Sequence, residues 1–161
     1  MDLVVDDPPV YLGGMPVRAE LCAPGIRINV CAQVLVARVP HQPVFQLTLQ
    51  DSLDPEALVD QSVLERFLRG VHAFAADQPS YWHCREGVNR SAFVLAAYLH
   101  LYRGLRISVA IDRLRTCRSP LVLCNTLFEE TLRTWYGDPD EQDFSRSRFA
   151  EVLQQRAKHT D

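Results

Sequence analysis

The chain has 161 residues, of which 47% are hydrophobic and 23% are charged, and these values fit a single globular domain with one well-covered core. Its formal net charge of -3 and the lack of a basic stripe argue against a nucleic-acid partner. No charged-then-apolar leader and no apolar run of about 18 residues occurs, so neither a signal peptide nor a membrane span is predicted.

The chain has five cysteines, an odd number without the spacing of a disulfide framework. This usage predicts a reducing, intracellular location in the cytoplasm. Cys22, Cys31, Cys117 and Cys124 are expected to pack as small apolar groups, and a role for one of them in resolving an oxidised Cys84 is the alternative. No histidine or cysteine spacing typical of a zinc site appears, so no metal is predicted.

Short strands are predicted first along the chain, because runs of apolar and β-branched residues lie between turn-forming residues. They span residues 9–13, 26–31, 44–49 and 79–83, with 34–39 as a candidate fifth strand. A helix is predicted over residues 56–76, where apolar residues at 59, 63, 67, 71 and 74 or 75 form one stripe. Asp54 is placed to cap this helix, followed by Pro55 and Glu56 in the first turn.

Helices dominate the second half of the chain. Residues 91–102 are apolar on nearly every face, as expected for a helix buried against a sheet. Ser108 is predicted to cap a third helix that ends near residue 115, and Asn125 a fourth over 127–136 that stops at Gly137. These elements predict an α/β fold, in which a single domain has a central mixed β-sheet flanked by helices.

Residues 138–161 are predicted to lie outside this domain. Residues 138–143 form an acidic, proline-containing linker, and 144–158 have the pattern of a short amphipathic helix. That helix is expected to pack on the domain or to fray, with a contact between the two copies of a homodimer as the alternative.

The most informative stretch is 83–92, His-Cys-Arg-Glu-Gly-Val-Asn-Arg-Ser-Ala, which joins the strand 79–83 to the helix 91–102. A loop wrapped around a helix start points backbone N–H groups at one spot, and the positive end of the helix dipole adds to their field. The expected occupant is an anion. In this field Cys84 is predicted to be a thiolate, and Arg90 to hold two phosphoryl oxygens with its planar fork.

Three neighbours complete the predicted site. Gly87 lies where the backbone bends without a side chain that would fill the loop. Ser91 is predicted to donate a hydrogen bond to the Cys84 sulfur when the sulfur becomes a leaving group, and His83 to orient Cys84 from behind. A lone cysteine or histidine is ordinarily a packing residue. The fixed spacing of all these residues, between a strand and a helix, favours the chemical interpretation.

These residues match every fixed position of the pattern His-Cys-x-x-Gly-x-x-Arg-Ser/Thr. The chain therefore resembles the cysteine-dependent protein phosphatases of the dual-specificity, atypical and poxviral-type group, within the protein tyrosine phosphatase superfamily. The resemblance implies a protein-tyrosine-phosphatase-like fold with a catalytic domain over residues 1–137. It also implies hydrolysis of phosphotyrosine, and of phosphoserine and phosphothreonine, in proteins through a cysteinyl-phosphate intermediate, with no metal or other cofactor.

Displacement by Cys84 leaves an alkoxide or phenoxide that must be protonated, so the mechanism needs an acid that faces the loop. Asp51 is the best candidate, because it follows the alternating run 45–49 and begins a polar loop. The acid of the family lies at the matching point. Asp54 is the rival, although it also fits a helix cap. The same carboxylate should then activate water against the cysteinyl phosphate.

The residues predicted to contact the substrate are Arg85, Glu86, Gly87, Val88, Asn89 and Arg90. Asn125 is a candidate for the asparagine of the Pro-Asn pair that braces the loop in the family, although here Asn125 does not directly follow Pro120. The short stretch between Val30 and Val44 predicts a low rim, which would admit phosphoserine and phosphothreonine as well as phosphotyrosine.

Three other functions stay open at this point. RNA 5'-triphosphatases resemble the chain at Asn89 but usually carry Thr-His where this chain has Arg85 and Glu86. Phosphoinositide phosphatases favour lysines in the loop, and this loop has none. A pseudophosphatase that only binds phosphate typically lacks the cysteine, the arginine or the acid, whereas this chain keeps all three. A phosphorylated protein is therefore the predicted substrate.

Overall fold

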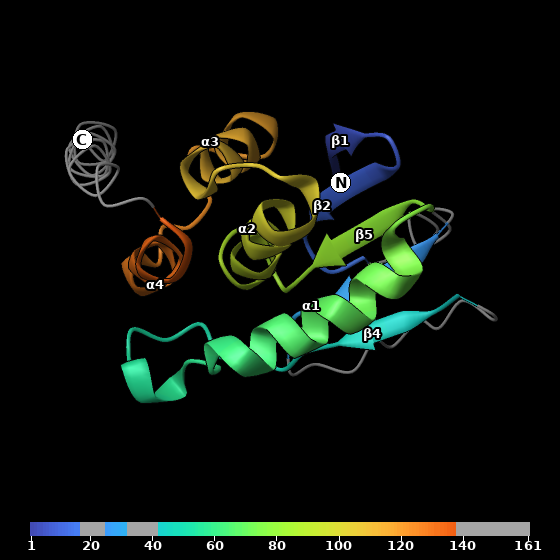
Figure 1. Cartoon of the computed structure of the whole chain (residues 1–161). Coiled ribbons are helices and arrows are strands. Elements are labelled where there is room, and N and C mark those ends of the chain that lie inside the picture. Colours follow the sequence, from blue (N-terminus) through green and yellow to red (C-terminus); the bar gives the residue numbers. More distant parts are fainter. Residues whose placement is uncertain (17–24, 32–41, 138–161) are drawn as a thin grey trace.

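The computed structural model describes residues 1–16, 25–31 and 42–137. Within them lies a mixed five-stranded sheet of order β1-β2-β5-β3-β4 (Figure 1). β1 (Asp2–Asp6) pairs antiparallel with β2 (Pro9–Gly13). β2, β5 (Ser80–His83), β3 (Ile26–Asn29) and β4 (Val44–Gln46) run parallel, so that their carboxyl ends meet at one edge of the sheet. Ligand sites of open parallel sheets form at this edge.

The four main predicted strands are present, and three are shorter than predicted. β3 ends at Asn29, β4 ends at Gln46 and β5 begins at Ser80. The prediction missed β1, whose three apolar residues stand between aspartates and are followed by Pro8, a pattern that resembles a loop. The candidate strand 34–39, the rim between Val30 and Val44 over residues 32–41, and the tail 138–161 lie outside the described residues.

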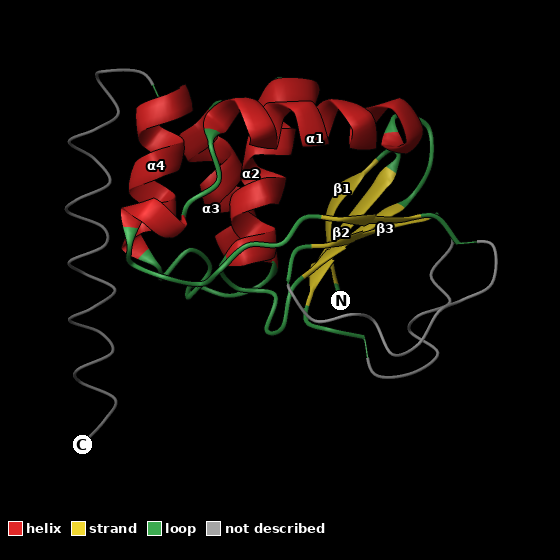
Figure 2. Ribbon diagram, turned by 90° about the horizontal axis from the view of Figure 1, so that it is seen from below, coloured by secondary structure: helices red, strands yellow, loops and turns green. Residues whose placement is uncertain are grey.

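The helices α1 (Gln61–Ala75), α2 (Arg90–Arg103), α3 (Ile107–Cys117) and α4 (Thr126–Tyr136) gather on one side of the sheet (Figure 2). α1 packs against β3, α2 against β5 and β2, and α3 against β1. α2 also contacts the other three helices, and every residue from Ser91 to Leu99 is buried. This central position explains why the α2 sequence is apolar on nearly every face.

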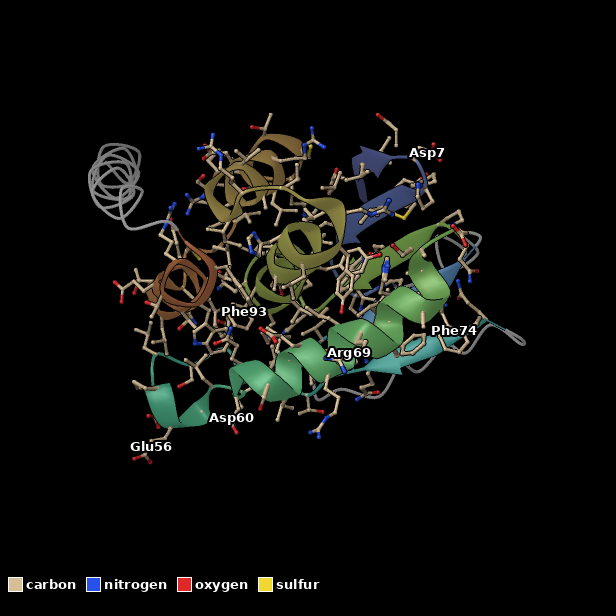
Figure 3. All side chains as sticks on the ribbon, viewed as in Figure 1. Asp7, Glu56, Asp60, Arg69, Phe74 and Phe93 are labelled. Atoms are coloured by element: carbon tan, nitrogen blue, oxygen red, sulfur yellow. The ribbon has the colours of Figure 1, made fainter. Side chains whose placement is uncertain are left out.

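The described helices are too short, or not apolar enough, for any of them to cross a membrane. The helical segments carry both buried apolar and exposed charged side chains. In Figure 3, Phe93 of α2 lies among the side chains between α2 and α4, where it stacks on Phe128 with ring centroids 4.8 Å apart. Glu56, by contrast, is exposed and points away from the rest of the molecule (Figure 3).

Two predictions about the helices need correction. The helix predicted over 56–76 begins at Gln61, after a short 3₁₀ turn, Pro55–Ala57, and its buried residues are Leu64, Leu68, Val71 and Ala75. Of the predicted stripe, Val71 and Ala75 are buried and Val59 and Phe67 pack partly buried against the core. The fully buried positions before Val71 are Leu64 and Leu68, each one residue after a predicted one, because apolar residues stand side by side at 63–64 and 67–68. Ser108 does not cap α3, since the helix begins two residues earlier than such a cap allows, at buried Ile107, and Arg106 takes the capping position.

Of the two predicted caps with acidic or amide side chains, the one at Asn125 is confirmed, and the one at Asp54 caps a different element. Oδ1 of Asp54 accepts a hydrogen bond from the Glu56 amide at 3.0 Å, which caps the 3₁₀ turn, whereas Asp60 occupies the N-cap position of α1. Oδ1 of Asn125 accepts one from the Leu127 amide at 3.1 Å, which caps α4. α4 ends at Tyr136, with Gly137 in the C-cap position as predicted.

A buried ion-pair network joins α3 to α4. Glu129 is 5% exposed and accepts hydrogen bonds from Arg115 at 2.5 Å and from Arg133 at 2.9 Å. Nε of Arg115 also donates to the carbonyl oxygen of Val122 at 3.1 Å. The network therefore fixes the segment between α3 and α4, which contacts the loop described next.

Candidate active site

Residues 84–90 form a loop at the carboxyl edge of the sheet, between β5 and α2. β5 is the central strand of the sheet, flanked by β2 and β3, and Cys84 follows it directly. Arg90 is the first residue of α2. Asn89 occupies the N-cap position without a side-chain cap, which leaves N–H groups of the first turn available for a ligand. The strand, loop and helix of the sequence prediction are all present.

Four carbonyl groups of the 84–90 loop are turned away from its inside and held by hydrogen bonds. Those of Arg85, Glu86, Val88 and Asn89 each accept a hydrogen bond. Their donors are, in that order, the Met15 amide at 3.0 Å, the Arg118 guanidinium at 3.1 Å, the Leu123 amide at 3.0 Å and the Phe93 amide at 2.8 Å. Since the C=O and the following N–H of a trans peptide point in opposite directions, the next amide in each case faces the inside of the loop.

Gly87 is required by two features of the loop. Its φ is +71°, a left-handed conformation that residues with a side chain rarely adopt. A Cβ atom at this position would lie 2.2 Å from the carbonyl carbon of Gly13 and 2.6 Å from the nitrogen of Gly14. The backbone of the loop therefore packs directly on the end of β2. The positive φ of Gly87 forms the sharp bend that the sequence predicts.

Two bracing residues, Arg118 and Leu123, were missed by sequence reasoning. Arg118 links the Glu86 carbonyl to β1, because it also pairs with the Asp2 carboxylate at 2.6 Å. Leu123 is fully buried and has a φ of +59°, which costs about 1–2 kcal/mol in a residue with a side chain. This backbone conformation brings the Leu123 amide to the Val88 carbonyl oxygen. No local sequence pattern marks either residue.

The Cys84 sulfur lies inside the loop, where the side chain is 2% exposed. It accepts hydrogen bonds from the Gly87 amide at 3.2 Å and from the Ser91 hydroxyl at 3.3 Å. Burial is the largest single influence and favours the neutral thiol. The hydrogen bonds from Ser91 and Gly87 and the charge of Arg90 together outweigh it, so the pKa of the Cys84 thiol is lowered from its ordinary value.

The lowered pKa of Cys84 predicts that alkylation of this thiol persists at pH values where free cysteine has become unreactive. The rate constant for iodoacetamide, followed on the Cys84 peptide by mass spectrometry, should fall with decreasing pH through a midpoint below that of free cysteine. Ser91→Ala removes one of the hydrogen bonds that lower the pKa, so its midpoint should move upward. A wild-type midpoint at or above that of free cysteine would contradict the assignment of Cys84 as a thiolate.

His83 directly precedes Cys84 in sequence but does not carry charge. The ring is fully buried and stacks on Tyr81 with centroids 5.4 Å apart. Burial, and next the positive charge of Arg27, lowers the pKa of His83 to about 4, although the nearby Cys84 backbone favours protonation. The ring is therefore neutral at pH 7. Its orienting role towards Cys84 stays a prediction.

Asp51 lies beside the 84–90 loop on a segment far from it in sequence. Its carboxylate accepts hydrogen bonds from Nδ2 of Asn89 at 3.3 and 3.2 Å and from Nδ2 of Asn125 at 2.9 Å. Its Oδ2 is 4.0 Å from Nε of Arg90. That Nε is buried and has no hydrogen-bond partner among the described residues. The structure thus brings a carboxyl group to the side of the Arg90 guanidinium.

Asn125 contacts both parts of this arrangement. Its side chain donates to Asp51 and, at 3.0 Å, to the carbonyl oxygen of Ser52, so it holds the segment that carries the carboxylate. Only its backbone amide contacts the loop, through Oδ1 of Asn89 at 3.1 Å. The side chain was predicted to brace the loop, and it fastens the neighbouring segment instead.

The remaining predicted contacts differ in exposure. Arg85 and Glu86 are exposed and pair with each other at 3.5 Å, whereas Val88, Asn89 and Arg90 are half-buried.

The cysteines other than Cys84 in the described ranges are free; Cys31 is buried, and Cys117 and Cys124 are partly buried. Cys124 does more than pack, since its thiol donates to Oδ1 of Asn89 at 3.4 Å. In residues 1–16, 25–31 and 42–137, no group of three or more histidine, cysteine or acidic residues could hold a metal ion.

Comparisons with known proteins give a family and a fold. The sequence matches the family described as dual specificity phosphatase, catalytic domain, over residues 21–138. No curated protein matches the chain. Human DUSP28 is similar in structure, with a TM-score of 0.67 and 20% identity over 96% of this chain and 99% of that chain. A mouse putative dual specificity phosphatase in complex with zinc tungstate has the same TM-score of 0.67 and 20% identity, over 89% of each chain. For PTPMT1 the TM-score is 0.60, with 18% identity over 98% of this chain and 99% of that chain. At these identities the solved structures establish the fold alone.

Proposed function

Because the chain belongs to the dual specificity phosphatase family and is therefore a cysteine-based phosphatase, we propose that it removes phosphate from tyrosine, serine and threonine side chains of proteins through a cysteinyl-phosphate intermediate. The observation that carries this proposal is the position of the Cys84 sulfur. It has a lowered pKa and lies in a loop whose amides face inward, next to Arg90. A thiolate in an anion-binding loop is the arrangement that attack on a phosphate ester requires.

In the first step the Cys84 sulfur attacks the phosphorus, the S–P bond forms, and the bond from phosphorus to the substrate oxygen breaks. The inward amides of the 84–90 loop and the Arg90 guanidinium bind the non-bridging oxygens, whose charge spreads in the transition state. The leaving oxygen takes a proton from the Asp51 carboxyl group. The support for this assignment is the position of Asp51 at the rim of the loop, 4.0 Å from Nε of Arg90.

In the second step a water molecule attacks the phosphorus of the cysteinyl phosphate, and the S–P bond breaks. Asp51, now ionised, accepts a proton from that water. The Cys84 sulfur leaves as a thiolate, and the Ser91 hydroxyl, 3.3 Å away, donates a hydrogen bond to it. The pair of electrons of the S–P bond thus returns to the sulfur, and the free enzyme is regenerated.

The substrate class can be tested by initial rates of the full chain on four substrates at equal concentration. They are a phosphotyrosine peptide, a phosphothreonine peptide, a phosphoinositide and a 5'-triphosphorylated RNA. We expect turnover of both peptides at higher rates than of the other two, because the loop carries no lysine for additional phosphates. Faster turnover of the phosphoinositide or the RNA would reassign the substrate. Binding of the peptides without turnover of any substrate would identify a binding module and overturn the proposal.

A further inference from the structure

The side chain of Asn89 bridges two segments that approach the 84–90 loop. Its Oδ1 accepts hydrogen bonds from the Asn125 amide at 3.1 Å and from the Cys124 thiol at 3.4 Å. Its Nδ2 donates to both carboxylate oxygens of Asp51, at 3.3 and 3.2 Å. One amide group is thus used as an acceptor on one side and as a donor on the other.

The orientation of this amide group is fixed by its partners. The Asn125 backbone N–H can only donate, so it requires Oδ1 of Asn89 on its side. Nδ2 must then face Asp51, where an ionised carboxylate can only accept. If the amide were turned over, two oxygens would face each other at Asp51 and two donors at Asn125. The bridge therefore presents an N–H donor to Asp51.

These contacts explain why Asp51 does not capture the anion-binding guanidinium. A carboxylate beside an arginine ordinarily pairs with it through two short hydrogen bonds. Here the Asp51 oxygens accept from Asn89 and Asn125 instead, the nearest approach to Nε of Arg90 is 4.0 Å, and that Nε has no hydrogen-bond partner among the described residues. The carboxyl group is close to the phosphate site, and Arg90 stays available for the phosphate.

We propose that Asn89 is a positioning residue for the acid of this reaction, which holds the Asp51 carboxyl group at the rim of the 84–90 loop and keeps it from pairing with Arg90. This role differs from the direct contact with substrate that its place in the loop predicts. The inference rests on the proposed function, since it requires Asp51 to protonate the leaving group.

The first test compares kcat/KM for phenyl phosphate, a poor leaving group, and 2,4-dinitrophenyl phosphate, which leaves without protonation. Asn89→Ala should lower kcat/KM for phenyl phosphate by about tenfold, the effect of losing hydrogen bonds to a charged group, and change the value for the activated ester much less. Equal losses on both esters would overturn the proposal, because damage to the loop itself slows both. Cys117→Ala, at the end of α3, serves as the control and should show the wild-type ratio.

A double-mutant cycle with Asp51→Asn tests whether the effect passes through the acid. In the Asp51→Asn background, Asn89→Ala should cause little further loss on phenyl phosphate, because the group that it positions is no longer an acid. Additive losses would assign Asn89 to the loop alone and contradict the proposal. If the wild-type protein hydrolyses neither ester, the proposed function fails. If the wild type is active and the cycle is additive, only this inference fails.

Asn89→Asp separates the positioning of Asp51 from the contact that joins the loop to the Asn125 amide. It replaces Asn89→Ala if the alanine variant does not fold. It keeps an oxygen for the Asn125 amide but puts a carboxyl oxygen in place of the N–H that faces Asp51. Asp51 would then be repelled or would share its proton with the new carboxyl group, and neither arrangement delivers the proton to the leaving group. We expect a selective loss on phenyl phosphate. Wild-type kinetics of Asn89→Asp on both esters would contradict the positioning role.

Discussion

Replacing Cys84 with serine should lower kcat for aryl phosphate hydrolysis by about 10⁴-fold or more. Serine has nearly the size of cysteine and can accept the hydrogen bonds from the Gly87 amide and the Ser91 hydroxyl. Its hydroxyl group does not ionise near pH 7, so the nucleophile is lost while the loop keeps its shape. Steady-state rates on an aryl phosphate measure the loss, and calorimetry with a phosphopeptide should show that binding is retained.

The matched control for this prediction is Cys117→Ser. Cys117 ends α3, is partly buried and packs against the core. Its replacement should leave kcat close to the wild-type value. If Cys84→Ser keeps substantial turnover, Cys84 is not the nucleophile, and a cysteinyl-phosphate intermediate is ruled out.

The second large effect is expected for Asp51→Asn. Loss of a general acid typically costs about 10²–10⁴-fold, and we expect a loss in this range in kcat/KM for phenyl phosphate. The loss should be much smaller for an activated aryl ester, whose leaving group needs no proton. Asparagine keeps an oxygen that can accept from the Asn125 amide group, so the segment should stay in place. Initial rates at low substrate concentration for the two esters give the comparison.

Asp54→Asn is the control for Asp51, because it alters the rival carboxylate and leaves its structural contact intact. Oδ1 of Asp54 caps the turn Pro55–Ala57, and asparagine is as good an N-cap as aspartate. We expect near-wild-type kcat/KM for both esters. If the losses for Asp54→Asn match those for Asp51→Asn, the acid has to be reassigned to Asp54.

The arrangement of the loop could be predicted from the sequence because it is local. Cys84, Gly87, Arg90 and Ser91 lie within one strand–loop–helix unit, so their spacing already predicts that they gather at one point. Asp54 and Asn125 were recognised as caps for the same reason, since a cap is a contact between residues close in sequence. The patterns of four strands and four helices likewise follow from the periodicity of neighbouring residues.

The supports of the loop could not be predicted, because they come from segments that are distant in sequence. Arg118 reaches Glu86 and Asp2, and the backbone of Leu123 reaches Val88, through contacts that no periodicity encodes. The bridge from Asn89 to Asp51 also depends on tertiary packing. β1 was missed for a related reason, since its three apolar residues become a strand only by pairing with β2.

The outward-facing carbonyls of the 84–90 loop have a consequence for turnover. Those carbonyl groups are held by the main chain or side chains of Met15, Phe93, Arg118 and Leu123. The inward-facing amides of the loop are therefore already in place before a ligand binds, and the loop loses little conformational freedom on binding. A loop of this kind binds the non-bridging oxygens and does not distinguish an esterified phosphate from one that has been released. Orthophosphate, the product, is therefore a competitor for the site, and preference for substrate over product has to come from groups beyond the loop.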